Sequence, residues 1–224
     1  MLDSPCSQTD DALSHLLHHC HRRRYPAKAA IIRAGDQGDT LYFVVEGSCT
    51  VSMPDKDSDE DIVLAYLNRG EFIGEIGVFM GPMVRDVNVR TREPSLLAEI
   101  NYDRLHGLLT TELSACAVNV LKILGRQVSS RLLDTSRKVR SLAFLDVSGR
   151  IAHALLDLAR QPDALTHPDG MQIRVTRQEL GRIVGCSREM AGRVLKALEE
   201  QGLIRVRGKT IVVPRPKAAP PPPA

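Results

Sequence analysis

The sequence predicts an α+β protein with a β-rich N-terminal domain, one long helix and a C-terminal winged helix-turn-helix. Short apolar runs broken by glycines extend from Ile31 to Glu99, which is typical of a β-barrel or β-roll. Residues 114–142 hold no proline and a single glycine, which predicts a helix of roughly 40 Å. Two short helices and two β runs follow between Arg174 and Val213. We place the domains at residues 1–113, 114–142 and 143–213, followed by a Pro-rich tail at 214–224 that we expect to be disordered.

Length and composition restrict the class of protein. The 224 residues suit two small domains. No apolar run approaches the length that spans a bilayer, and the N-terminus lacks a charged start followed by an apolar stretch, so we expect a cytoplasmic protein without a membrane partner. The five cysteines are scattered and odd in number, and we expect reduced thiols.

The N-terminal 24 residues combine a small predicted helix, carried by Leu13, Leu16 and Leu17, with a dense group of possible metal ligands. Ligands crowded so densely in sequence cannot all converge on one ion, so we expect no metal site. The group consists of His15, His18, His19, Cys20 and His21.

Local capping signals define the helix-turn-helix. Thr176 and Glu179 have the spacing of a capping box at a helix start, and Gly185 ends this first helix. Ser187 is placed to cap a second helix directly afterwards, and Gly202 ends it. Two helices so close in sequence predict a helix-turn-helix.

The second helix separates an apolar side from a polar side. Four apolar residues recur at helical spacing and should face inward: Ala191, Val194, Leu195 and Leu198. The opposite side then carries Arg188, Glu189, Gly192, Arg193 and Lys196. Arginine can bind both acceptors of guanine, and glutamate can accept from the amino group of cytosine, so this side can read bases. The alternative is an arginine-rich helix that merely faces solvent.

Two features favour the base-reading interpretation. The β runs Leu203–Val206 and Thr210–Val213 form a wing whose tip, residues 207–209, is basic. Between Arg174 and Val213 there are nine Lys or Arg and four Asp or Glu, although the whole chain carries only +3. Positive charge is therefore concentrated where DNA phosphates would lie.

The long helix carries an apolar seam that predicts a homodimer. Its members recur every three or four positions, as in a coiled coil. They are Ala117, Leu121, Leu124, Val128, Leu132, Thr135, Val139 and Leu142.

Three segments resemble one bacterial family. V-G-C-S-R-E-M-A-G-R at 184–193, A-F-L-D-V at 143–147 and G-K-T-I-V-V at 208–213 are similar to the catabolite activator protein branch of the Crp/Fnr superfamily. The resemblance extends from about His19 to Val213. It implies a dimeric transcription regulator, not an enzyme, with a cyclic-nucleotide-binding β-roll as its sensor domain. No His or Asp spacing near Arg85 suggests a hydrolytic metal cluster or nucleophile either.

Within this resemblance, Gly70 to Arg90 match the phosphate-binding cassette. Gly74, Glu75 and Ile76 match its amide segment, and Arg85 matches its arginine. Cyclic-AMP receptors have a serine at the next position, where this chain has Asp86. A carboxylate there would repel a phosphodiester at a cost of about a few kcal/mol in a partly dry pocket.

Asp86 could instead accept from the N–H groups of a guanine edge. An acidic residue at this position resembles the Clp-type regulators, which implies cyclic di-GMP as the ligand, although the usual residue there is glutamate. Cyclic AMP and an unliganded pocket stay open. Thr135 and Ser136 match nucleotide contacts of the family. Arg131 and Arg137 could neutralise a second phosphate or simply be exposed charges.

The resemblance also implies DNA and polymerase contacts. In a palindromic TGTGA-like site, Arg188 and Arg193 would contact guanine, Glu189 cytosine, and Arg177 and Lys209 phosphates, with Gln178 and Ser187 beside them. The contacts to RNA polymerase would come from His21, Arg23, Arg104, Thr166, His167 and Gly170, the last three in a turn-rich loop at residues 161–170. The alternative for the basic residues is a solubilising surface. The ligand could either strengthen or weaken DNA binding.

Overall fold

The computed structural model describes residues 9–54 and 61–214. They divide into two compact units, with the division between Arg137 and Lys138. This division falls inside the helix α4, Ala117–Phe144, so each unit includes part of that helix. The sequence-derived boundaries stay predictions. The predicted Pro-rich tail begins one residue too early, because Pro214 is the last residue of a strand, and the rest of the tail lies outside the described residues.

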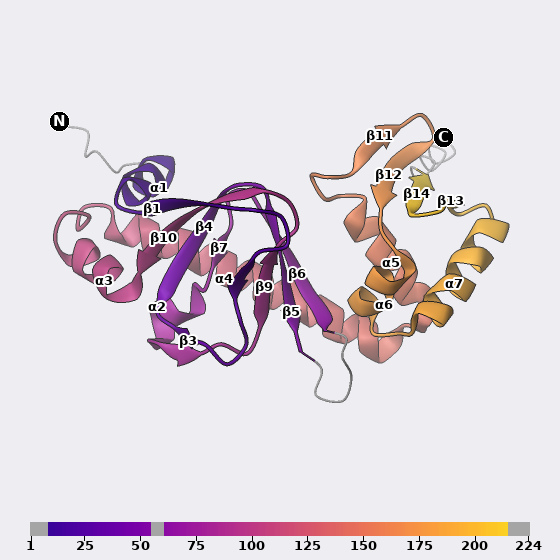
Figure 1. Cartoon of the computed structure of the whole chain (residues 1–224), viewed down its shortest axis with the longest axis horizontal. Coiled ribbons are helices and arrows are strands. Elements are labelled where there is room, and N and C mark those ends of the chain that lie inside the picture. The colour runs from indigo at the N-terminus through magenta and orange to yellow at the C-terminus, as the bar shows by residue number, and fades with distance from the viewer. Residues whose placement is uncertain (1–8, 55–60, 215–224) are drawn as a thin grey trace, which may run out of the picture. The chain divides into compact units, whose positions relative to one another are not determined.

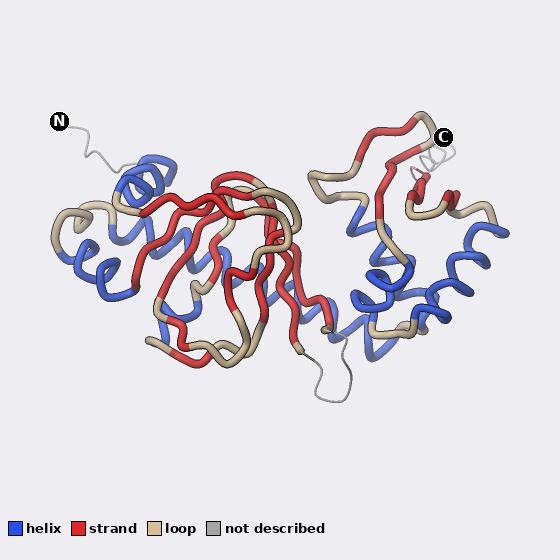
Figure 2. Tube along the Cα trace, in the orientation of Figure 1, coloured by secondary structure: helices blue, strands red, loops and turns tan. Residues whose placement is uncertain are grey.

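The first unit is a β-roll built from two antiparallel four-stranded sheets (Figures 1 and 2). One sheet has the order β1-β10-β4-β7, the other has the order β2-β9-β5-β6, and β3 pairs with β8. The strands of the first sheet are β1 His21–Tyr25, β10 Ser95–Asn101, β4 Thr40–Glu46 and β7 Phe72–Ile73. Those of the second are β2 Ala30–Ile32, β9 Asn88–Thr91, β5 Ser48–Met53 and β6 Ile62–Asn68; β3 is Gln37–Gly38 and β8 is Met83–Val84.

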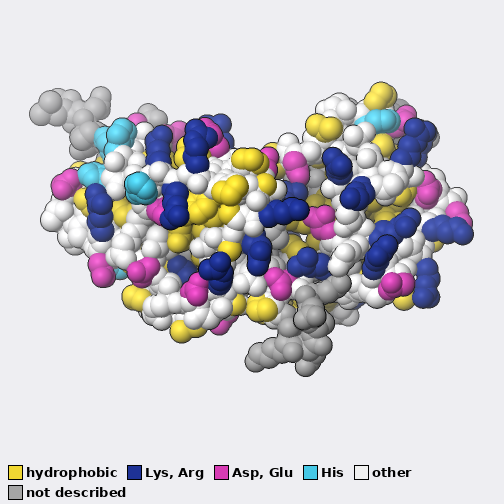
Figure 3. Space-filling model, in the orientation of Figure 1, with side chains coloured by type: hydrophobic (Ala, Val, Ile, Leu, Met, Phe, Trp, Pro, Cys, Tyr) yellow, Lys and Arg dark blue, Asp and Glu magenta, His cyan; other side chains and the backbone are white. Residues whose placement is uncertain are grey.

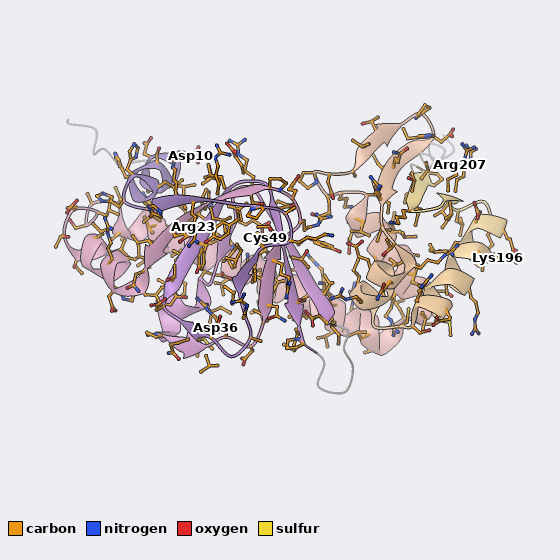
Figure 4. All side chains as sticks on the ribbon, in the orientation of Figure 1. Asp10, Arg23, Asp36, Cys49, Lys196 and Arg207 are labelled. Carbon is orange, nitrogen blue, oxygen red and sulfur yellow. The ribbon has the colours of Figure 1, made fainter. Side chains whose placement is uncertain are left out.

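Alternation along β4 supplies two separate cores. Val44 and its neighbour Tyr42 face the interior between the two sheets, where Cys49 is also buried (Figure 4). Leu41 and Phe43 face the other side and pack against helices. The helices of this unit are α1 Thr9–His18, α2 Ile76–Met80, α3 Tyr102–Thr110 and the first part of α4.

The chain is already β-structured at His21, ten residues before the predicted start. β1 has the sequence H-R-R-R-Y, and its first four residues are exposed. It is an edge strand that pairs only with β10, so no apolar alternation marks it in the sequence. The small predicted N-terminal helix is confirmed as α1.

Helix α4 begins three residues later than predicted, because residues 111–116 form turns. The predicted seam is wrong in its first half. Leu124 is fully buried in the core of its own unit, and Ala117 is half-buried. A mostly exposed stripe, here called the exposed stripe, instead alternates steps of three and four. It runs through Val118, Leu121, Gly125, Val128, Leu132, Thr135, Val139 and Leu142, of which Gly125 and Val128 are half-buried and the others exposed.

The second unit confirms the predicted helix-turn-helix. It contains α5 Val147–Leu158, β11 Leu165–His167, β12 Gly170–Arg174, α6 Arg177–Val184, α7 Arg188–Glu200, β13 Arg205–Arg207 and β14 Thr210–Pro214. Thr176 Oγ1 accepts from Glu179 N at 3.1 Å, and Ser187 Oγ accepts from Met190 N at 3.2 Å. Gly185 ends α6 in the left-handed conformation, with φ 69°.

The wing belongs to a larger sheet than the sequence predicted. Its order is β11-β12-β14-β13, and β13 begins at Arg205 rather than Leu203. The predicted turn-rich loop at 161–170 is partly wrong, because its last six residues contain β11 and the first residue of β12. The segment Q-P-D-A-L-T-H-P-D-G has too few apolar residues to indicate a strand, so only the pairing with β12 defines it.

We had expected all the cysteines to be reduced thiols, and this expectation is wrong for Cys116. Cys20, Cys49 and Cys186 are free, whereas Cys116 is disulfide-bonded. Burial raises the pKa of the Cys49 thiol to about 11, so this thiol is not reactive at neutral pH. No helix within 9–54 and 61–214 is both long and apolar enough to cross a membrane.

Candidate functional sites

The predicted cassette is a turn between β7 and the short helix α2. Gly74 joins them with φ 86°, and a Cβ built there would lie 2.9 Å from Thr40 O. Only glycine fits this backbone. Glu75 follows as the N-cap of α2, and here Gly77 N donates to Gly74 O and Val78 N to Glu75 O, both at 3.1 Å, which leaves the amides before Gly77 for an anion. Amides arranged in this way can receive an anion.

Arg85 is held beside this turn by hydrogen bonds. Its Nη2 donates to Thr40 O at 2.9 Å and to Tyr102 Oη at 2.9 Å. Tyr102 Oη in turn donates to Gly74 O at 2.6 Å. Burial raises the pKa of Tyr102, so its hydroxyl keeps its proton at neutral pH. Sequence reasoning missed Tyr102, because it lies 28 positions from Gly74.

Gly38 provides the surface on which Arg85 lies. A Cβ built at Gly38 would be 2.1 Å from Arg85 Nε, so any larger residue displaces the guanidinium. Gly38 was also missed by sequence reasoning. Its only signal was its position at a strand break.

Buried Glu75 and half-buried Arg131 form an ion pair, which revises the interpretation of Arg131 as a partner for phosphate. The side chain of Glu75 is only 3% exposed, and its Oε1 accepts from Arg131 Nη1. Glu71 adds a second carboxylate at 3.8 Å from Arg131 Nη2. In this structure the charge of Arg131 is therefore balanced within the protein.

The other predicted ligand-binding residues are exposed. Asp86 follows Arg85 directly, and Thr135 and Ser136 lie on α4, one turn beyond Arg131. Ser136 Oγ donates to Leu132 O at 2.9 Å, and Arg137 Nη1 donates to Asp134 Oδ1 at 2.7 Å. The structure thus gathers Gly74, Glu75, Ile76 and Arg85 in one turn and its neighbourhood, and leaves the α4 residues on an exposed face.

The second unit presents a basic concave surface between α7 and the wing. Its lining consists of Arg177, Arg188, Glu189, Gly192, Arg193, Leu195, Lys196, Glu199 and Val206. The four predicted inward residues of α7 are all buried. Figure 3 shows Lys and Arg side chains along this unit, and Figure 4 labels Lys196 on α7 and Arg207 at the end of β13.

Three local contacts shape this surface. Glu199 Oε1 accepts from Val206 N at 2.8 Å, which ties α7 to the wing. A Cβ built at Gly192 would lie 3.4 Å from Arg177 Cδ, so α7 and the Arg177 stem pack closely. The Glu189 N–H and the Ser187 hydroxyl lower the pKa of the Glu189 carboxyl, which keeps it an ionised acceptor.

The remaining predicted DNA contacts are exposed around this surface. Gln178, Ser187 and Lys209 all face solvent, although the Ser187 hydroxyl already caps α7. Gly208 in the wing turn has φ 64°, so glycine is favoured there and Lys209 follows at the tip.

The predicted polymerase contacts lie on both units. His21 and Arg23 are exposed on β1, and Arg104 is exposed on α3. Thr166 is exposed on β11, and His167 Nδ1 accepts from Asp169 N at 3.1 Å. Gly170 is buried, where a Cβ would lie 2.1 Å from Val213 O, so the sheet itself requires glycine. Within the described residues, no group of three or more His, Cys, Asp or Glu could hold a metal ion.

Comparison with known proteins connects both units to regulators. Residues 22–112 match the cyclic nucleotide-binding domain, and residues 149–218 match the Crp-like helix-turn-helix domain. The chain is 54% identical over 204 residues to the cAMP-activated global transcriptional regulator Vfr of Pseudomonas aeruginosa, covering 90% of this chain and 92% of Vfr. The chain belongs to the Crp/Fnr family.

Other Crp/Fnr members are similar over the same extent. The CRP-like protein Clp of Xanthomonas euvesicatoria is 51% identical over 90% of this chain and 87% of Clp. The structure of CLP from Xanthomonas campestris, described as a c-di-GMP responsive global regulator, has a TM-score of 0.86 and 49% identity, covering 92% of this chain and 100% of CLP.

Family membership confirms the predicted architecture and class. The chain has a cyclic nucleotide-binding domain, a long helix and a Crp-like helix-turn-helix, and it is a DNA-binding transcription regulator. Members of the family act as dimers.

Proposed function

We propose that this Crp/Fnr regulator is a homodimer that binds a palindromic TGTGA-like DNA site and whose DNA affinity depends on cyclic di-GMP. The second candidate ligand is cyclic AMP. The observation that carries the DNA-binding part is that Arg188, Glu189 and Arg193 line one exposed concave surface on α7. Asp86, directly after Arg85, carries the choice of ligand.

The exposed stripe of α4 supports the dimer. Val118 is 63% exposed, Leu132 66% and Val139 61%, on a helix whose buried residues, Val120 and Leu124, lie in its first half. Such a stripe at heptad spacing is stable in water when a second copy covers it. A dimer would place two α7 helices about 34 Å apart, so that they read half-sites one turn apart.

The cassette geometry supports a phosphate-containing ligand. Only Nη2 of Arg85 has acceptors among the described residues, so the other guanidinium nitrogens keep donors for a phosphate. Asp86 is an exposed acceptor beside this phosphate position. It suits the ring N–H and amino donors of guanine and disfavours a second anionic oxygen.

The relatives divide between the two ligands. CLP, described as c-di-GMP responsive, supports cyclic di-GMP, whereas Vfr, described as cAMP-activated, favours cyclic AMP. Asp86 is the feature of this chain that argues against cyclic AMP.

Calorimetric titration of wild type and Asp86→Ser with both nucleotides tests the choice of ligand. We expect the wild type to prefer cyclic di-GMP and Asp86→Ser to shift toward cyclic AMP by at least about tenfold, since one carboxylate–phosphate repulsion is removed. Asp103→Ser, at an exposed position of α3, is the control and should leave both affinities unchanged. A wild type that prefers cyclic AMP contradicts the proposed ligand.

Gly38→Ala tests whether Arg85 holds the phosphate. The new methyl group must displace the Arg85 guanidinium, and losing a charged hydrogen bond costs about 1.5 to 3 kcal/mol, so nucleotide affinity should fall about tenfold or more. The matched control is Gly107→Ala on α3, where a Cβ meets nothing within 4 Å. Unchanged nucleotide affinity in Gly38→Ala would exclude Arg85 from the binding site.

We further propose that the exposed residues His21, Arg23, Arg104 and Thr166 and the half-buried His167, with the backbone at Gly170, contact RNA polymerase. Their support is the exposure of the side chains together with the basic character of β1.

A further inference from the structure

The free edge of strand β7, at one end of the first sheet, is hydrogen-bonded by a side chain instead of another strand. β7 pairs with β4 on one side, and no strand of the described residues pairs with it on the other. Gln127 of α4 occupies that open side. Its Oε1 accepts from Phe72 N at 2.8 Å, and its Nε2 donates to Phe72 O at 2.7 Å. One amide side chain therefore satisfies both backbone groups of an edge-strand residue.

Arg131, one turn later on α4, extends this contact to the cassette. Its Nη2 donates to Phe72 O at 2.6 Å, and its Nη1 donates to Glu75 Oε1. Helix α4 thus holds the strand before Gly74 and the residue after it. The cassette turn is fixed to α4 on both sides.

The clamped strand has little freedom of its own. The Phe72 side chain is 2% exposed, and its ring centroid lies 4.8 Å from that of Phe43. On its other side, Val44 N donates to Glu71 O at 2.9 Å. A displacement of Gln127 must therefore either move the Phe72 peptide or leave its buried N–H without a partner, while Phe72 O keeps only Arg131, and an unpaired buried N–H is costly.

Gln127 also lies next to the exposed stripe of α4. Its neighbour in sequence, Val128, is a member of that stripe. Any change in how α4 packs along the stripe also shifts or rotates Gln127, since both belong to one continuous helix.

We propose that Gln127 is a positioning residue that couples the cassette to α4: its amide clamps Phe72, so that nucleotide binding and α4 packing change together. This inference rests on the proposed function, since the coupling is read through nucleotide and DNA. Gln127 contacts neither ligand. It acts through Phe72, and mutations of such intermediate residues change coupling by about twofold to thirtyfold.

A purely structural role for Gln127 predicts a different result. If the amide only caps an edge strand, removing it lowers stability and leaves the nucleotide's effect on DNA affinity intact. The decisive quantity is the coupling ratio, which is the DNA affinity with saturating nucleotide divided by the affinity without it.

The test measures this ratio for full-length wild type, Gln127→Leu and Gln127→Glu, with a TGTGA-palindrome duplex and with cyclic di-GMP or cyclic AMP. Leucine keeps the size but removes both hydrogen bonds. Glutamate keeps the acceptor for Phe72 N and loses the donor. Arg126→Leu, at the exposed neighbouring position, is the matched control. Hydrogen exchange at the Phe72 amide reports directly on the clamp.

We expect Gln127→Leu to shift the coupling ratio at least about fivefold toward 1, Gln127→Glu to be intermediate, and Arg126→Leu to match wild type. Exchange at Phe72 should speed up in Gln127→Leu only. A wild type that responds to neither nucleotide overturns the proposed function. If the wild type responds to a nucleotide and both Gln127 variants keep the wild-type coupling ratio, this inference alone is overturned. If Gln127→Leu does not fold, the Gln127→Glu ratio decides.

Discussion

Arg193→Ala is expected to lower affinity for the cognate palindrome by about 1 to 3 kcal/mol per half-site and to relax base choice at one position. Arg193 is exposed on α7 and lines the concave surface together with Arg188 and Glu189. Because the residues on the other side of α7 are buried, the Arg193 side chain points away from the core of its unit. Alanine removes the guanidinium that we propose to bind both guanine acceptors, so the variant should no longer discriminate against other bases at that position.

Lys209→Ala is the matched control for Arg193→Ala. Lys209 is also exposed and basic, but it lies at the tip of the wing. Its loss should weaken all sequences alike and reduce the salt dependence of binding by about one charge. Gel-shift titrations on cognate and scrambled duplexes at several salt concentrations separate the two results. Equal losses on both duplexes for both variants would refute the assignment of Arg193 to a base.

Gly181→Ala is expected to destabilise the DNA-binding unit by about 1 to 3 kcal/mol and to lower its unfolding temperature by about 4 to 8 °C per kcal/mol. Helix propensity alone predicts the opposite sign, because alanine normally stabilises a helix by about 1 kcal/mol relative to glycine. Gly181 is buried in α6, however, and a Cβ there would lie 2.5 Å from Cys186 O. That carbonyl belongs to the turn between the two helices, and Cys186 N also donates to Gly181 O at 3.0 Å. The backbone cannot move away cheaply.

Gly192→Ala provides the comparison within the same unit. Its Cβ would meet only the Arg177 stem, at 3.4 Å, which is an ordinary contact. This variant should unfold at the same temperature as wild type or slightly higher, even if the methyl group weakens DNA binding. Thermal unfolding followed by circular dichroism measures both variants. If Gly181→Ala is as stable as Gly192→Ala, close packing in the turn is not the reason for glycine at 181.

The elements that sequence predicted well are those defined by local chemistry. The caps Thr176 and Ser187 and the terminating Gly185 act within three or four residues, so their signals lie next to the elements they define. The cassette turn was located through the family resemblance instead, and the positive φ of Gly74 explains why glycine stands there.

The elements that sequence predicted poorly depend on what lies opposite them. β1 was missed because it is exposed, and its only sign is the pairing with β10. On α4, the first half carries two apolar stripes, and sequence alone assigned Leu124 to the wrong one. Both stripes have helical spacing, and only the packing of the β-roll shows which one is already covered.

The sequence by itself determined the order of the domains and the helix-turn-helix with the polar side of its second helix, since these follow from propensities, caps and periodicity close together in the chain, and the family resemblance added the cassette. Only the tertiary structure decided which polar groups form hydrogen bonds or ion pairs with each other. Gln127 and Phe72 are 55 positions apart, and Arg131 and Glu75 are 56 apart. Pairs so distant in sequence form because burial leaves their polar groups no water, and the fold alone decides which partner replaces it.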